Sequence, residues 1–243
     1  MRLFDYLPLR TTGRLIAAAV ITATVGFGMV STAGAVDSIT IYKNSLKTSE
    51  SRDEIRQFGA GNCKRGGSSS AFRAKIGKGT RECFYRVPMA GRDLEVSATA
   101  RIFKSTPKSV RPQIYAAVGL RQARDGSRYQ LAVYPSSRRF QLRKVLDNGR
   151  ILTLDGGKLG KKVKGFNEAN RLTLRAYNDL PGQPSGSTRL VAIVNGNRVS
   201  VTDDARGNLL QGQDTTFSIG SKKGANGALG SFVKVVMRLP DPF

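Results

Sequence analysis

Apolar and polar residues alternate along most of this chain, and a period of two is the pattern of half-buried β-strands. No window of twelve or more residues has the 3.6-residue spacing of a long helix, although residues 49–58 are expected to form one short helix. The sequence therefore predicts an all-β protein. The alternating segments are residues 94–103, 113–121, 128–134, 139–146, 171–177 and 189–195, with shorter candidates at 216–219 and 231–239.

Turn residues separate these strands. Asn195-Gly196 suits a two-residue hairpin turn, because both residue types tolerate positive φ, and it predicts a hairpin between residues 190–194 and 198–202. Residues 59–80 are rich in Gly, Ser and Lys and are expected to form a loop. At least eight regularly spaced strands predict an antiparallel sandwich or jelly roll. We expect one domain from residue 36 to residue 243.

The first 35 residues are expected to be a targeting segment. Arg2, Arg10 and Arg14 precede or begin an apolar run over residues 15–34, which ends in Ala33-Gly34-Ala35. A basic start, an apolar centre and a small-x-small ending predict a secretory signal peptide. An uncleaved membrane anchor helix is the alternative, since about 20 apolar residues can span a bilayer. Either predicts a secreted or extracytoplasmic cell-surface protein, because positive residues stay on the cytoplasmic side.

Net charge and composition exclude some kinds of catalytic and metal site and indicate the kind of partner. The chain has 40 Lys+Arg against 17 Asp+Glu, a net charge of +23, and neither His nor Trp. Without His there is no Ser-His-Asp triad and no imidazole metal site, and we predict no metal or other cofactor. The positive charge favours polyanions. No nucleic-acid motif is present, so the expected partner is a polysaccharide or another anionic cell-envelope polymer, with membrane contact only through an N-terminal anchor.

The chain has two cysteines, Cys63 and Cys83. In an exported protein such a pair predicts a disulfide. Two thiols without His do not complete a tetrahedral zinc site, and a C-x-x-C redox spacing is absent. We expect the bridge to pin the segment 59–80 to the sheet.

Several segments resemble known sequences when they are taken in order. They are Asp93-Leu94-Glu95-Val96, Gly126-Ser127-Arg128-Tyr129-Gln130-Leu131-Ala132-Val133, Asn170-Arg171-Leu172-Thr173-Leu174 and Val194-Asn195-Gly196-Asn197-Arg198-Val199, followed by Asp203. Over residues 91–239 this order resembles the concanavalin A-like lectin/glucanase superfamily, in its laminin-G-like and keto-disaccharide-hydrolase-like branches. The resemblance implies an antiparallel jelly-roll sandwich.

The resemblance carries no catalytic motif with it. The E-x-D-x-x-E string of the glucanase branch is absent, and Tyr129-Gln130-Leu131-Ala132 stands where the hydrolase-like branch often has Y-E-x-Q. Gln is neither a general acid nor a general base. Laminin-G-like domains often bind calcium, but Asp125, Asp203 and Asp204 lie in no calcium-loop motif. We therefore predict no catalytic or metal site and a non-catalytic binding domain. A glycan-processing hydrolase with acids not yet placed, and a laminin-G-like protein-interaction module, remain alternatives.

The period of two also assigns side chains to faces. Tyr129, Leu131, Val133, Leu142, Leu172 and Leu174 are expected to point into the core. The opposite face carries Arg, Gln and Tyr, which suit an anionic glycan because Arg grips a carboxylate or phosphate with two hydrogen bonds. A merely solvated sheet face is the alternative. The predicted ligand-binding residues are Tyr115, Arg121, Arg128, Gln130, Tyr134, Arg143 and Arg175, of which Arg128, Gln130, Tyr134, Arg143 and Arg175 are expected to share one shallow groove on one sheet.

Overall fold

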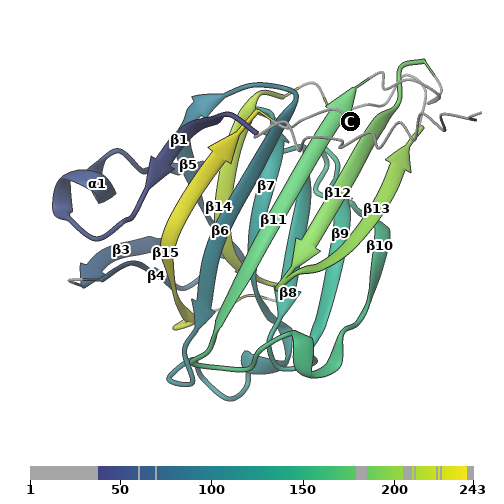
Figure 1. Cartoon of the computed structure of the whole chain (residues 1–243). Coiled ribbons are helices and arrows are strands. Elements are labelled where there is room, and N and C mark those ends of the chain that lie inside the picture. The colour runs from purple at the N-terminus through teal and green to yellow at the C-terminus, as the bar shows by residue number, and fades with distance from the viewer. Residues whose placement is uncertain are drawn as a thin grey trace, which may run out of the picture. The chain divides into compact units, whose positions relative to one another are not determined.

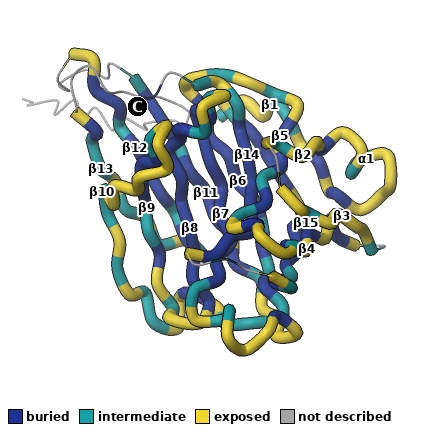
Figure 2. The backbone as a smooth tube through the Cα atoms, turned by 180° about the vertical axis from the view of Figure 1, so that it is seen from behind, coloured by how far each residue is buried: buried dark blue, intermediate teal, exposed yellow. Residues whose placement is uncertain are grey.

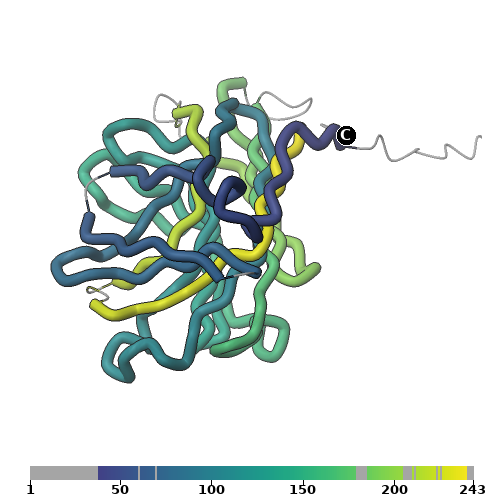
Figure 3. Tube along the Cα trace, turned by 90° about the vertical axis from the view of Figure 1, so that its left-hand side faces the viewer, coloured from purple at the N-terminus to yellow at the C-terminus, as the bar shows by residue number. Residues whose placement is uncertain are grey.

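Two antiparallel β-sheets stack face to face in the computed structural model (Figures 1 and 3). The structure describes residues 38–239 except 60, 69, 179–184, 205–209, 211, 223 and 225. The predicted signal peptide or anchor, residues 1–35, lies outside this part. Within the described part, no helix is both long and apolar enough to cross a membrane.

The first sheet, called sheet A, has eight strands. Along the sheet they are β13 (Asn197–Asp203), β12 (Thr188–Val194), β11 (Ala169–Asn178), β6 (Leu94–Ile102), β15 (Leu229–Arg238), β4 (Ala71–Ile76) and β3 (Cys63–Ser68), and β1 (Thr40–Asn44) also pairs with β15. A short helix, α1 (Ser49–Asp53), lies beside β3 and β4 at one edge of the sandwich (Figure 1). Thr48 and Ser51 cap it reciprocally. The helix predicted over residues 49–58 is thus confirmed in its first half, whereas residues 56–58 form a short strand instead.

The second sheet, called sheet B, has seven strands. Their order is β10 (Ile151–Lys158), β9 (Arg139–Val145), β8 (Arg128–Tyr134), β7 (Ile114–Gln122), β14 (Asp214–Ser221), β5 (Glu82–Ala90) and β2 (Arg56–Phe58). Consecutive strands β5, β6 and β7 alternate between the sheets, and so do β13, β14 and β15. Single-turn 3₁₀ helices precede β7 (Arg111–Gln113) and follow β10 (Gly160–Lys162). The predicted all-β antiparallel sandwich is confirmed.

The core lies between the sheets and consists of the inward-facing residues of both. All six core residues predicted from the alternation are buried. Burial of each apolar side chain of this size contributes about 1.5–3 kcal/mol, which fixes the register of the strands. Aromatic rings join the layers at one end: Phe217 of β14 and Phe232 of β15 have ring centroids 4.4 Å apart.

Two local predictions are confirmed and one is wrong. Asn195 and Gly196 have φ of 49° and 88° in the turn between β12 and β13, as the hairpin prediction requires. Cys63 and Cys83 form the predicted disulfide with a Cα–Cα distance of 5.7 Å, and it ties β3 of sheet A to β5 of sheet B. The segment 59–80, however, is not a loop. It contains the β3–β4 hairpin, whose edge strand β3 is too exposed to show an apolar alternation.

Candidate functional site

The outer face of sheet B is polar and yet largely buried. Every residue of β7 and β8 is buried, on both faces of these strands, so the tube in Figure 2 is dark blue along both. On the outer face this burial comes from long polar and aromatic side chains that lie flat against one another. A sheet face that faced only water would show alternating exposure instead. This face therefore holds an organised polar cluster.

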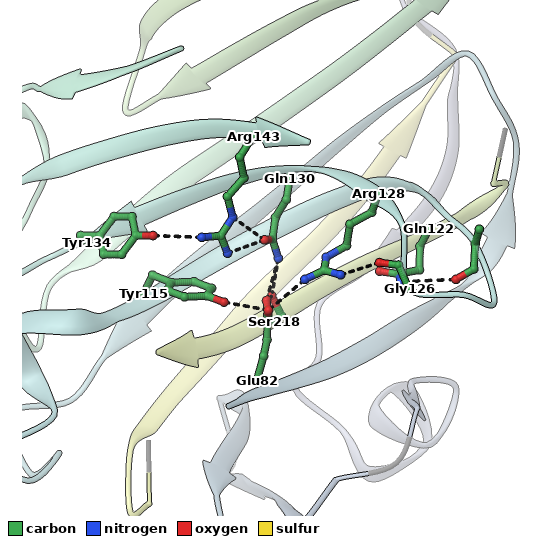
Figure 4. Close-up of polar contacts among 10 residues, drawn as sticks. Glu82, Tyr115, Gln122, Gly126, Arg128, Gln130, Tyr134, Arg143 and Ser218 are labelled. Atoms are coloured by element: carbon green, nitrogen blue, oxygen red, sulfur yellow. Dashed lines mark hydrogen bonds and ion pairs between the residues drawn. The ribbon is translucent and has the colours of Figure 1, made fainter. Parts of the chain in front are cut away.

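Glu82 lies at the centre of this cluster (Figure 4). One carboxylate oxygen accepts hydrogen bonds from Gln130 Nε2 at 2.7 Å and Ser218 Oγ at 2.6 Å. The other accepts from the Tyr115 hydroxyl at 2.7 Å and from Arg128 Nη2 at 3.0 Å. The side chains of Glu82 and Arg128 are only 9% and 8% exposed. Both oxygens of Glu82 are thus occupied by protein donors.

A second tier of bonds extends the cluster toward β9. Gln130 Oε1 accepts from Arg143 Nε at 2.8 Å and also from Arg143 Nη2. Arg143 Nη1 donates to the Tyr134 hydroxyl at 3.0 Å, and that hydroxyl donates to Gln141 at 2.8 Å. We call the residues of both tiers the Glu82 network: Glu82, Tyr115, Arg128, Gln130, Tyr134, Gln141, Arg143 and Ser218.

Two glycines make room for this arrangement. Gly220 lies between Glu82 and Tyr115 in the register of β5, β14 and β7, and a Cβ there would lie 2.4 Å from the Tyr115 hydroxyl. The missing side chain therefore lets the Tyr115 ring cross β14 and reach Glu82. At Gly119 a Cβ would lie 2.7 Å from Thr216 Oγ1 and 3.8 Å from Arg128 Cδ, so Arg128 extends over this position.

Aromatic rings hold the two guanidinium groups in place. The Arg143 guanidinium lies 4.4 Å from the centroid of the Tyr115 ring, and that of Arg128 lies 4.3 Å from the Phe84 ring. The Tyr115 and Tyr134 rings are 5.4 Å apart. Cation–π contacts of this kind are stronger where water is excluded. The planar groups of the cluster are therefore fixed in orientation.

The electrostatics favour a charged Glu82. Burial alone would raise the pKa of its carboxyl, but the charges of Arg128 and Arg143 and the hydrogen bonds from Ser218 and Tyr115 hold that pKa below its ordinary value. Burial and then the Glu82 charge raise the pKa of Tyr115, which stays a neutral donor. The network thus holds one carboxylate that is paired directly with Arg128 and linked to Arg143 through Gln130.

A cavity of about 460 Å³ opens over the network. Glu82, Tyr115, Arg128 and Arg143 line it, together with Phe84. The remaining lining comes from turns and strand ends and includes Arg81, Asp125, Gly126, Asp147, Gly149, Ser221 and Lys222. A larger cavity of about 760 Å³ shares Gly79, Thr80 and Arg81 with the first, so the two cavities adjoin at these residues.

The structure brings five of the seven predicted ligand-binding residues together on this face: Tyr115, Arg128, Gln130, Tyr134 and Arg143. The placement of Arg175 on the same sheet is wrong, because β11 belongs to sheet A, where Arg175 pairs with Glu95. These arginines are also more buried than a shallow groove implies, since Arg143 is 1% exposed.

Arg121 is the second correction. Its φ of 54° reverses the alternation at the end of β7. The side chain therefore lies inside the end of the sandwich, where it bonds Thr188 at 2.7 Å, Asn178 at 2.9 Å and Asp93 at 3.1 Å. It does not line the cavity.

Glu82 is not among the binding residues predicted from the sequence. It begins β5 beside Cys83 and has no motif around it. The sequence offers one indication, which is the position of Glu82 in the alternation of β5. It shares the outward face of this strand with Phe84, and it is the only acid in β5.

Two of the three acidic residues considered as calcium ligands have other roles. Asp125 accepts the Ser127 backbone N–H at 2.8 Å, which stabilises a turn. Asp203 accepts from Lys144 at 2.8 Å and from the Tyr129 hydroxyl at 2.6 Å between the sheets. No group of three or more Cys, Asp or Glu placed to hold a metal ion occurs among the residues that the structure describes.

Solved structures share this architecture. The chain is similar to a carbohydrate-binding module, CBM66, from Bacillus subtilis (TM-score 0.55, 11% identity, 76% of this chain and 95% of that one). It is also similar to a galectin-like protein of unknown function from Bacillus subtilis (0.59, 10%, 83% and 96%). A third similar structure is a Crh5 transglycosylase in complex with NAG (0.57, 10%, 83% and 84%). No protein-family model matches the chain, and no curated protein does. The fold is a concanavalin A-like sandwich, and at these identities the similarity extends to the fold alone.

Proposed function

We propose that this chain is a secreted or cell-surface, non-catalytic carbohydrate-binding domain, and that its glycan lies in the cavity over the Glu82 network. One observation carries the proposal: planar hydrogen-bonding groups, locked in orientation by one another, form the floor of a cavity beside aromatic rings. Sugar hydroxyls are recognised by such fixed planar groups, and preorganisation lowers the entropy cost of binding. The similar structures that are carbohydrate-binding or glycan-processing proteins support the same class of ligand.

Two buried polar atoms belong to residues that line the cavity and have no hydrogen-bond partner among the described residues. Arg128 Nε and Ser221 Oγ are buried, and neither forms a hydrogen bond among the described residues. Buried polar groups of this kind are costly unless they are satisfied. Because water does not reach these two atoms, a glycan hydroxyl would bond to them only after a shift of the side chains, and the turn glycines Gly126 and Gly149 would leave room for its approach.

The state of Glu82 favours binding over hydrolysis. A glycosidase needs a protonated carboxyl as general acid, with a raised pKa, and a second carboxylate close by. Glu82 instead has a lowered pKa and four protein donors on its two oxygens. It is suited to orient the arginines and Gln130 rather than to transfer a proton.

The rim and the adjoining cavity favour an anionic polymer. Arg81 lies where the two cavities meet, and Lys222 lies over the Tyr134 ring at 5.4 Å. Neither forms an ion pair with a described acid. Two adjoining cavities with unpaired cations at their rims suit a polysaccharide that carries carboxylate or phosphate groups.

The proposal is tested by measuring how the wild-type chain binds to an array of neutral and anionic glycans at low and at high salt. Anionic oligosaccharides should bind, and binding should weaken as salt rises. An array with no bound glycan would contradict the proposal and favour a protein-interaction module. Release of new reducing ends from a bound glycan would favour the alternative of a glycan-processing hydrolase.

A further inference from the structure

The outer face of sheet A, on the opposite side of the sandwich, carries a second arrangement of charges. Glu95 of β6 lies in register between Arg175 of β11 and Arg238 of β15. Its carboxylate is bonded by both guanidinium groups, one on each oxygen. The Glu95 side chain is only 3% exposed, so this face already holds one carboxylate between two cations.

Further along the same three strands, the same pattern recurs without the acid. Thr99 of β6 lies in register between Arg171 of β11 and Lys234 of β15. At the ordinary spacing of strands the two cationic residues have Cα atoms roughly 10 Å apart. Thr99 is too short to reach between them, and it carries no charge.

A small cavity of about 150 Å³ occupies this position. Its lining includes the three cations Arg171, Lys234 and Arg238 and the hydroxyl residues Ser97 and Thr99, and it includes no acid. That volume equals several water molecules at about 30 Å³ each, which is room for one small oxyanion.

Two of the three cations that line this cavity lack partners among the described residues, whereas Arg238 is paired with Glu95. Arg171 and Lys234 are exposed, and neither side chain forms an ion pair or hydrogen bond with a residue that the structure describes. Arg101, the next residue of β6 on the outer face, has a buried Nε without a hydrogen-bond partner among the described residues. Water and salt screen the repulsion between these positive charges, and a bound anion would reduce it further.

We propose that this cavity is a binding site for one oxyanion group, a carboxylate or a phosphate, held between Arg171 and Lys234 as Glu95 is held between Arg175 and Arg238. Arg binds such a group with two parallel hydrogen bonds, Lys adds a point charge, and the Thr99 hydroxyl is a further donor. The site lies on the other sheet from the Glu82 network and does not rest on the carbohydrate proposal.

The test is a titration of the full chain, labelled with ¹⁵N, with inorganic phosphate and separately with acetate, the ionic strength being held constant with chloride. The backbone amides of Ser97 and Thr99 should shift and saturate at millimolar concentrations of at least one anion. The anion that saturates identifies the group, phosphate or carboxylate. Shifts that rise linearly without saturation for both anions would overturn the proposal.

Variants of the cationic residues show whether the anion binds in this cavity. Arg171→Gln with Lys234→Gln should weaken binding at least tenfold, and Lys234→Gln alone should weaken it severalfold. The control is Arg198→Gln, which removes an exposed charge from β13 on the same face outside the cavity and should change binding less than twofold. The amide spectrum reports in each case whether the variant is folded. Equal binding by the double variant and the control would contradict the site. Loss of glycan binding on the other face would leave this result unchanged.

Discussion

Each outer face of the sandwich holds a glutamate with a largely buried side chain near two arginines, but Glu95 is bonded by both of its arginines, whereas Glu82 is bonded by Arg128 and reaches Arg143 through Gln130. Around Glu82 on sheet B, an amide and hydroxyls satisfy the carboxylate, aromatic rings fix the arginines, and a cavity opens above. Around Glu95 on sheet A, both arginines are partly exposed, and further cations along the strands are left unpaired. The glutamate on one face is therefore part of the floor of a cavity, and the glutamate on the other leaves excess positive charge along its strands.

Removal of each glutamate should show the largest difference between the faces. Glu82→Ala leaves Arg128 and Arg143 buried without a counter-charge, and loss of one partner of a buried ion pair costs about 3–5 kcal/mol. Glu95→Ala should cost less, about 1–3 kcal/mol, because Arg175 and Arg238 are 30% and 25% exposed and can reach water. Urea unfolding of both variants measures the two losses. Equal losses would show that the exposure of the arginines does not determine the cost of removing the glutamate.

Removal of the disulfide should act on one face only. The bridge joins β3 to β5 directly beside Glu82. Closure of a loop of this length stabilises the fold by roughly 3 kcal/mol. Cys63→Ser with Cys83→Ser should therefore lower the unfolding free energy by about that amount and weaken glycan binding, while the anion site on sheet A is unchanged. An unchanged glycan affinity in the double variant would show that the disulfide does not maintain the geometry of the Glu82 network.

A single methyl group at Gly220 should disturb sheet B alone. Because the added Cβ would lie 2.4 Å from the Tyr115 hydroxyl, Gly220→Ala should cost about 1–3 kcal/mol and displace that hydroxyl from Glu82. The matched control is Gly66→Ala on edge strand β3, where no atom lies within 4 Å of the new Cβ. The control should be neutral or up to about 1 kcal/mol more stable. Thermal unfolding compares the two, and a neutral Gly220→Ala would contradict the close approach of Tyr115.

The smallest expected effect is a pH dependence. Because the pKa of Glu82 is lower in the folded chain than in the unfolded one, its ionised form stabilises the fold above the unfolded pKa of about 4.3. That stabilisation is lost as the pH falls through the folded pKa. The difference in unfolding free energy between wild type and Glu82→Gln should thus be constant above about pH 5.5 and shrink below about pH 4. A difference that grows in acid would mean that the folded state raises this pKa.

Much of the sandwich was predictable, because a strand with one buried face must alternate apolar and polar residues along its sequence. Residues 128–134 were assigned both the correct strand limits and the correct faces, since a slip of one residue would expose Tyr129, Leu131 and Val133 together. The edge strands β3 and β10 were not predicted, because exposed strands bury no continuous apolar face.

The candidate site was only partly predictable, for three physical reasons. Alternation gives the face of a strand but not the sheet to which it belongs, so Arg175 was placed with the wrong neighbours. It also fails where the backbone leaves the β region, as at Arg121 with its positive φ. Glu82 is joined to Gln130 and Ser218 by contacts across 48 and 136 residues, and no local pattern encodes such contacts.

The central claim, that the outer face of sheet B binds a glycan, is tested most directly by calorimetric titration of the anionic oligosaccharide that binds best on the array. Arg81→Ala with Lys222→Ala removes two rim charges and replaces no residue of the Glu82 network, and Arg198→Ala removes a charge outside both sites. We predict that the double variant binds at least tenfold more weakly than wild type, and that Arg198→Ala stays within twofold of it. Binding by the double variant that equals wild type would contradict the account.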